Sequence, residues 1–244
     1  MAITLPTTKT EVDKSFKSQK FLMLGSAGIG KSAFWAQEPK ALFLETESGL
    51  NALEVFRIQI RSWNDLRESY VALKAGIDGG KFPYELIVID TVDRLIDFAQ
   101  EEVVNRAKDF YKKIEINTIG DIPNGAGWYK QKEMVMGFFN KLELLPCAIA
   151  CVAHSDIKRI KEPTAEFDKN TISIGGQLGD DILAWADHTM NVESHMSGDR
   201  TQRMIYTIPT QSREAKSRGG MIPNMMKWGE STVENYKAFR ALFK

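Results

Sequence analysis

The chain has 244 residues, of which 43% are hydrophobic and 26% are charged, an ordinary composition for one large α/β domain. Its 32 basic residues balance its 32 acidic residues, so the overall charge does not indicate a nucleic-acid coat protein or a membrane-surface binder. The opening segment lacks the pattern of a leader, and no run approaches the ~20 apolar residues that span a bilayer. We therefore expect a cytoplasmic protein without membrane contact.

Short apolar strands alternate with longer amphipathic helices, which predicts βαβ units and a mainly parallel sheet in one domain over 1–244. We expect an amino-terminal arm over 1–18 and a carboxy-terminal helix over 229–244. Cys147 and Cys151 share one apolar run, and period-two alternation puts both on one face of a buried strand as reduced core residues. The near-continuous apolar runs predict strands at 20–24, 41–45, 85–90, 147–153, 188–193 and 203–208. Helices are predicted to begin at Lys31, near Asn64, Thr91, Tyr129 and Gly176, and at about Ser231.

The segment GSAGIGKS matches the pattern GxxxxGKS directly after a predicted strand and at the start of a predicted helix. Its glycines allow backbone conformations that let successive amides converge on phosphate oxygens at the positive end of a helix. Lys31 would reach the β and γ phosphates, and Ser32 would supply a hydroxyl to Mg2+. We predict an ATP site formed by Gly25, Ser26, Ala27, Gly28, Ile29, Gly30, Lys31, Ser32 and Ala33.

Acidic residues follow two of the predicted strands. Asp90 ends the apolar run LIVID, where a carboxylate would complete the magnesium site; it could also cap the following helix, and the two roles are compatible. Glu45 and Glu47 follow the second strand, where a carboxylate could activate a water for attack on the γ phosphate. We assign this role to Glu47, and a solvent-exposed glutamate without a catalytic role is the alternative.

The order of these motifs resembles the RecA-like recombinase core, which includes RecA, RadA-like proteins and ring helicases related to DnaB. It is most similar to compact phage-encoded nucleotide-binding or single-strand annealing proteins of this class. The likeness covers most of residues 21–192, in GSAGIGKS, FLETESGL, LIVIDTVDRL and the stretch from AIACVAHSD through TISIGGQLGDDILAWADHTMNV. It implies an α/β fold with a RecA-like P-loop NTPase core, in which a mainly parallel sheet is flanked by helices.

The resemblance also implies roles for individual residues. Glu47 matches the hydrolytic glutamate, and His154 matches the sensor that contacts the γ phosphate, although a lone histidine at a strand end is more often a surface group. The segment REAKSRGG resembles the KxR element that members project into the neighbouring subunit's nucleotide. Lys216 and Arg218 would then act in trans as cationic fingers that neutralise transition-state charge; a solvated basic loop is the alternative.

Two loops hold single-stranded DNA in the family, and the matching segments here are 116–128 and 157–175. Trp128 or Tyr129 could stack on bases. Acidic residues dilute the charge of the second segment, so a mobile solvated loop is the alternative. The cations that would contact phosphates, on a chain expected to be irregular, are Lys158, Arg159, Lys161 and Lys169.

The sequence thus predicts an ATP-hydrolysing recombination protein that assembles as a ring or filament on single-stranded DNA, with ATP between subunits. A single-strand-binding protein is a candidate partner, and the location would be the host bacterial cytoplasm if a phage encodes the chain. Because the extra terminal domains of bacterial RecA are missing from the sequence, annealing is expected rather than strand exchange. A DnaB-like helicase or helicase-loading motor would use the same core. A P-loop NTPase without a nucleic-acid role is disfavoured by the REAKSR element.

Overall fold

The computed structural model describes residues 5–162, 165–197, 200–229 and 231–244. Small parts of three predicted segments lie outside these ranges: residues 1–4 of the amino-terminal arm, 163–164 of the second DNA loop and 230 of the carboxy-terminal segment. Within the described ranges, no helix has both the length and the hydropathy that crossing a membrane requires.

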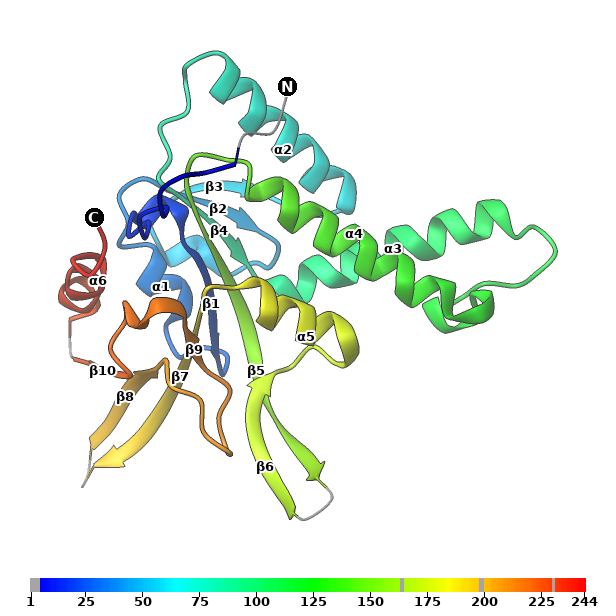
Figure 1. The fold of residues 1–244 in the computed structure, drawn as a ribbon. Coiled ribbons are helices and arrows are strands. Elements are labelled where there is room, and N and C mark those ends of the chain that lie inside the picture. The colour runs from blue at the N-terminus through cyan, green and yellow to red at the C-terminus, as the bar shows by residue number, and fades with distance from the viewer. Residues whose placement is uncertain (1–4, 163–164, 198–199, 230) are drawn as a thin grey trace.

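A mainly parallel sheet forms the centre of the molecule, with helices on both of its faces (Figure 1). The strand order is β10-β8-β7-β1-β5-β4-β2-β3, and every pairing from β7 to β3 is parallel. The fold class predicted from the sequence is therefore confirmed. The main path comprises β1 (Lys20–Gly25), β2 (Ala41–Glu45), β3 (Phe56–Gln59), β4 (Leu86–Asp90), β5 (Ala148–Glu162), β7 (His188–Ser197), β8 (Arg200–Tyr206) and β10 (Met225–Trp228), and two strands branch from it, β6 (Ala165–Ile172) and β9 (Lys216–Ser217).

The helices begin within three residues of their predicted starts. Side-chain caps explain three of these starts: Ser62 accepts from the Asp65 amide at 3.2 Å, Thr91 from the Arg94 amide at 3.4 Å, and Ser231 from the Glu234 amide at 3.3 Å. The helices of the described residues are α1 (Lys31–Trp35), α2 (Trp63–Asp78), α3 (Val92–Phe110), α4 (Ala126–Leu142), α5 (Gly176–Trp185) and α6 (Thr232–Arg240).

Two hydrophobic cores lie on the two faces of the sheet. In β1, Leu22 and Leu24 face the core beneath helices α2 to α5, while Phe21 and Met23 face the core shared with α1 and α6. Strands buried on both faces must be apolar at every position, which is why their sequences are continuous hydrophobic runs. The free thiols of Cys147 and Cys151 belong to the first core, as predicted.

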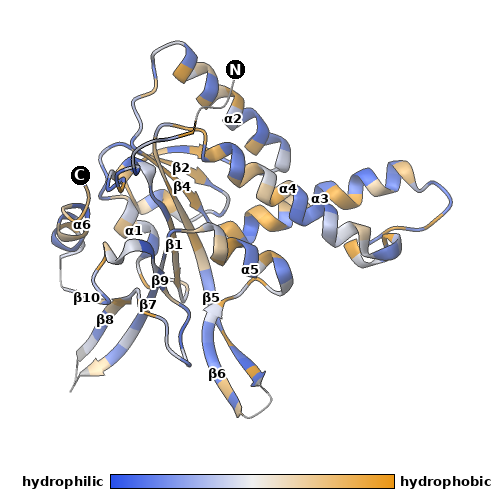
Figure 2. Ribbon diagram, viewed as in Figure 1, coloured by the Kyte–Doolittle hydropathy of each residue, from blue (hydrophilic) through white to orange (hydrophobic). Residues whose placement is uncertain are grey.

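Two hairpins extend the sheet beyond the core, one formed by β5 and β6 and the other by β7 and β8 (Figure 1). The expectation of an irregular chain over 157–175 is therefore wrong for most of that segment. Strand β5 continues from the core to Glu162 and pairs with β6, and it turns hydrophilic where it leaves the sheet (Figure 2). Strands β3, β9 and β10 also escaped prediction, because they are short or lie in segments rich in glycine and charge.

Candidate active site

The segment Gly25–Ser32 connects the end of β1 to the first turn of α1. Gly28 and Gly30 have φ of 74° and 108°, left-handed conformations that residues with side chains disfavour. The chain thereby turns around the ammonium of Lys31, which donates to the carbonyl oxygens of Gly25 at 2.7 Å and of Ser26 at 2.9 Å. Residues 25–33, the predicted nucleotide-binding set, thus form one loop and helix start with the lysine inside.

Lys31 is 5% exposed and lies within the field of three carboxylates. Burial lowers the pKa of Lys31, and the charges of Asp90, Asp93 and Glu47 oppose this by favouring the ammonium form. These carboxylates come from the end of β4, the first turn of α3 and the loop after β2. Parallel strands end at the same side of a sheet, so the fold gathers one cation and three anions around the loop.

Asp90 and Ser32 provide adjacent oxygen atoms at the end of β4 and the start of α1. Asp90 is 6% exposed, and burial raises the pKa of its carboxyl. A hydrogen bond from Ser32 and the charge of Lys31 act against burial, because both lower the pKa of that carboxyl. A carboxylate beside a hydroxyl is a donor set that suits Mg2+, which prefers oxygen ligands and takes few of them from protein. The two predicted magnesium ligands therefore fit that ion.

Glu45 and Glu47 occupy different surroundings. Glu45 is 4% exposed, and its carboxylate lies 3.4 Å from Arg57, within reach of two backbone amides of the following turn. Glu47 is exposed, and it accepts a hydrogen bond of 2.9 Å from the hydroxyl of Thr91, the residue next to Asp90. Only Glu47 therefore combines access to water with a position beside the phosphate loop, which favours the predicted assignment.

His154 lies on β5, the strand between β1 and β4, and pairs in register with Gly25. Its backbone amide donates to Asp93 at 3.0 Å, and its Nδ1 lies 3.5 Å from the same carboxylate. The other oxygen of Asp93 accepts a hydrogen bond from the Ser173 hydroxyl, close to the start of α5. The predicted sensor is therefore joined through Asp93 to the segment that follows β6.

A pocket of about 600 Å3 lies beside this network. Trp128 and Tyr129, at the start of α4, form part of its wall and are 55% and 62% exposed. Asp93 and the segment 173–178 also line the pocket. The fold thus brings the ends of the two predicted DNA loops to one cavity, although 116–128 and 157–175 are far apart in sequence.

The four cations of the second predicted DNA loop lie on the β5–β6 hairpin, and each contacts an oxygen of this chain. Cross-strand pairs of opposite charge are typical of an exposed antiparallel ribbon. Their positive charge is therefore largely balanced within the described chain. The contacts are Arg159 to Asp168 (3.1 Å) and Glu166 (3.3 Å), Lys161 to Glu166 (3.6 Å), Lys169 to Glu214 (2.6 Å), and Lys158 to the Ile174 carbonyl (2.8 Å).

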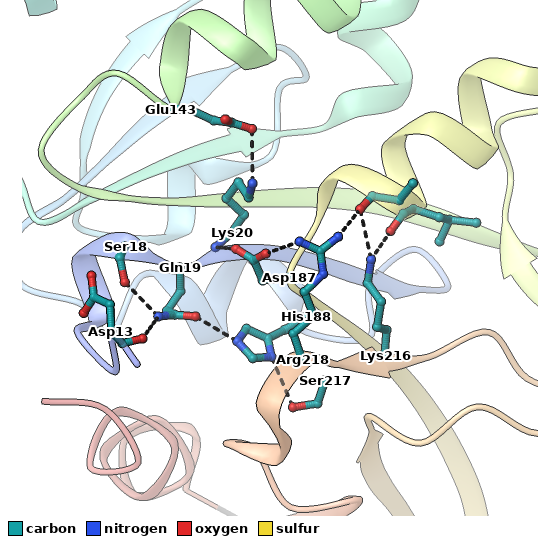
Figure 3. A network of polar contacts seen from close by, with 12 residues as sticks. Asp13, Ser18, Gln19, Lys20, Glu143, Asp187, His188, Lys216, Ser217 and Arg218 are labelled. Atoms are coloured by element: carbon teal, nitrogen blue, oxygen red, sulfur yellow. Dashed lines mark hydrogen bonds and ion pairs between the residues drawn. The ribbon is translucent and has the colours of Figure 1, made fainter. Parts of the chain in front are cut away.

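Lys216 and Arg218 lie at the carboxy-terminal end of α5, where both side chains contact backbone carbonyls of that helix (Figure 3). Both donate to the Ala184 carbonyl, Lys216 at 3.2 Å and Arg218 at 2.8 Å, and Arg218 also pairs with Asp187 at 2.8 Å. Burial and the charge of Arg218 lower the pKa of Lys216. Both side chains thus cap a helix end that favours cations.

The register of the sheet places the backbone of these two cations several residues of strand away from their own phosphate loop. The residue between them, Ser217, pairs with His188, which pairs with Phe21 of β1. Phe21 precedes Gly25 by four residues, about 13 Å of extended strand. In the structure the two side chains therefore lie away from their own phosphate loop and contact the end of α5.

Sequence reasoning missed three polar residues of this site. Thr91 and Asp93 follow Asp90 directly in the run DTVD, so a signal for them was present, but an aspartate in the first turn of a helix also serves the helix dipole. Ser173 comes from a segment 80 residues away from Asp93, and only the fold joins the two.

Residues 17–219 match the family described as AAA domain, which is most of the chain. The chain belongs to this AAA domain family. It is 27% identical over 226 residues to the SPbeta prophage-derived uncharacterized protein YorG of Bacillus subtilis strain 168, covering 92% of this chain and 66% of that protein. The chain thus spans just under two thirds of that relative's length.

Among solved structures, the KaiC-like protein PH0186 of the hyperthermophilic archaeon Pyrococcus horikoshii OT3 aligns with a TM-score of 0.48 and 11% identity. The alignment covers 89% of this chain and 88% of that one. With the phosphate loop, the buried Asp90 and the AAA family match together, the chain is an AAA-type P-loop ATPase.

Proposed function

We propose that this ATPase assembles on single-stranded DNA as a homo-oligomer, with ATP between subunits, and acts in recombination or strand annealing. The observation that carries the proposal is the link from the phosphate loop to the pocket beside Trp128. Asp93 both binds His154, which lies in register with Gly25, and lines that pocket. A change at the γ phosphate would therefore reach the DNA-facing surface through a single side chain.

In the proposed reaction, the loop amides and Lys31 hold the triphosphate. Ser32 and Asp90 would hold Mg2+, which supplies charge neutralisation on the β and γ phosphates when bound. Glu47, oriented by Thr91, accepts a proton from water as the water oxygen bonds to the γ phosphorus and the bond to the bridging oxygen of ADP breaks. His154 would donate to an oxygen of the γ phosphate and so report its presence.

The pocket supports single-stranded rather than double-stranded nucleic acid. Exposed aromatic rings such as Trp128 and Tyr129 can stack on bases only when the bases are unpaired. Residues at the start of α5, which is the positive end of that helix, line the same pocket. We assign the β5–β6 cations a smaller share, because three of the four are paired with carboxylates of this chain.

The test is binding of a fluorescently labelled oligonucleotide at increasing salt, with and without a non-hydrolysable ATP analogue. We expect ATP-dependent binding that weakens with salt. Trp128→Ala should weaken binding about tenfold, since stacking of one base is worth roughly 1–3 kcal/mol. Phe110→Ala is the matched control, because Phe110 is 77% exposed on the same helical hairpin but does not line this pocket.

Each outcome of this assay selects a function. Absence of binding at low salt would remove both DNA functions and leave a P-loop NTPase without a nucleic-acid role. Binding together with directional unwinding of a duplex would favour the helicase motor over recombination. Equal losses in Trp128→Ala and Phe110→Ala would contradict a DNA site at the pocket.

Assembly can be tested through complementation between two inactive variants. Lys216→Ala should lose hydrolysis without losing ATP affinity, because its own phosphate site is intact. Lys31→Ala should be inactive because its own phosphate site lacks the lysine, but it keeps Lys216 for the site of a neighbouring subunit. Mixing the two should restore part of the activity in a steady-state phosphate-release assay, because the intact site of one subunit meets the intact lysine of the other.

A purely structural role of Lys216 predicts a different result. Loss of its hydrogen bonds at the end of α5 would then lower the melting temperature, and mixing the variants would restore nothing. No recovery of activity in mixed assemblies would therefore contradict the trans role of Lys216.

A further inference from the structure

Arg203 reaches the phosphate loop from β8, two strands away from β1 in the sheet. Its guanidinium donates to the carbonyl oxygen of Ile29 at 2.9 Å. Trp228 of β10 is the register partner of Arg203, and its ring centroid lies 4.7 Å from the guanidinium carbon. The buried indole packs on Phe34 of α1, with ring centroids 5.4 Å apart. Trp228, which packs on α1, thus holds the Arg203 guanidinium against the phosphate loop that leads into the same helix.

The carbonyl that accepts from Arg203 belongs to the peptide group between Ile29 and Gly30. In a planar trans peptide the C=O and N–H bonds point in opposite directions. With the oxygen turned toward Arg203, the Gly30 N–H is turned away from it. No acceptor for this N–H occurs among the described residues, so it remains available to a ligand.

Gly30 gives this peptide a backbone conformation and a close contact that a residue with a side chain would not tolerate. Its φ of 108° is accessible to glycine and strained for other residues. A Cβ at this position would lie 2.8 Å from a guanidinium nitrogen of Arg203. The glycine therefore allows the close approach of Arg203, and it also lowers the barrier to rotation of the peptide plane.

We infer that Arg203 is a positioning residue of the phosphate site, which keeps the Gly30 N–H directed at the bound phosphates. Its hydrogen bond fixes the oxygen side of the Ile29–Gly30 peptide. It also polarises that peptide, so the N–H becomes a stronger donor. The inference rests on the phosphate site at Gly25–Ser32 and adds a residue that lies about 170 positions later in the chain.

The test measures binding of ATP and of inorganic triphosphate, with Mg2+, to Arg203→Met by calorimetry. Methionine keeps most of the side-chain volume and removes the donor and the charge. We expect both ligands to bind about tenfold more weakly, the effect of roughly one hydrogen bond. Because the Gly30 N–H would contact phosphate before and during hydrolysis, KM should rise while kcat changes by less than about threefold.

Arg240→Met is the matched control, since Arg240 also stacks on an aromatic ring, Phe16, at 4.1 Å but far from the loop. It should bind both ligands as the unmodified protein does. If Arg203→Met does not fold, Arg203→Lys replaces it, because lysine keeps one donor and the charge while losing the planar stack. Arg203→Lys should bind triphosphate more weakly than the unmodified protein and Arg240→Met do. Its loss of affinity should be smaller than the tenfold loss expected for Arg203→Met.

Two results separate the inference from the phosphate site itself. If the unmodified protein does not bind triphosphate, the phosphate site fails and the inference fails with it. If the unmodified protein binds and the Arg203 variants bind equally well, only the inference is overturned. A loss confined to ATP, with triphosphate binding unchanged, would overturn it too, because Arg203 would then act on the nucleoside.

Discussion

Replacing Lys31 with alanine is expected to abolish measurable ATP hydrolysis and to weaken ATP binding by about 100-fold or more. The ammonium lies inside the loop, where it donates to the Gly25 and Ser26 carbonyls, so a triphosphate can replace these contacts with stronger charged ones. Its loss also removes the charge that favours ionisation of Asp90, so the predicted magnesium ligand becomes harder to deprotonate.

The same replacement should leave the fold intact. Removing the side chain relieves the desolvation of a buried charge, which offsets the loss of its hydrogen bonds to the Gly25 and Ser26 carbonyls. Calorimetry with ATP and Mg2+, together with thermal melting, separates the two effects. Lys40→Ala is the control, since Lys40 is a surface lysine paired with Glu85 at 2.9 Å. Normal ATP binding by Lys31→Ala would contradict the assignment of Gly25–Ser32 as the nucleotide site.

The phosphate loop and the magnesium ligands could be predicted from sequence because their signals are local. Gly25–Ser32 is one contiguous pattern, and Asp90 ends an unmistakable apolar strand. Parallel strands end at one side of the sheet, which is sufficient to bring Asp90 and Glu47 to the loop without knowledge of the strand order. The apolar runs predicted six strands, each with at least one end within two residues of its place in the structure.

Contacts between distant segments could not be predicted in this way. Arg203 is one arginine among many in the sequence, and only the order β1, β7, β8 and the register with Trp228 bring it to Ile29. Ser173 and Asp93 are 80 residues apart in the sequence, and their contact likewise depends on how the fold places their two segments.

The β5–β6 hairpin escaped prediction for another physical reason. Beyond its base, where Ile172 is buried, the described part of the hairpin is largely exposed: Ile157 is 69% exposed, and cross-strand pairs such as Arg159 with Asp168 replace hydrophobic contacts. Without a hydrophobic period of two, a charged ribbon and a charged loop have the same sequence pattern. The prediction of an irregular chain followed from the glycine, proline and charge content of the segment, whereas β5 simply continues from the core into the hairpin and pairs there with β6.

Replacing Glu47 with glutamine should lower the hydrolysis rate about 10²- to 10⁴-fold and leave ATP affinity nearly unchanged. Glutamine can still accept the 2.9 Å hydrogen bond from Thr91, so the side chain keeps its place, but an amide cannot take a proton from the attacking water. Single-turnover hydrolysis and equilibrium ATP binding measure the two quantities separately.

Glu45→Gln is the matched control: it weakens the contact with Arg57 and should cost about 1 kcal/mol of stability while turnover continues. Normal turnover in Glu47→Gln, or a loss of turnover confined to Glu45→Gln, would move the general base from Glu47 to another group.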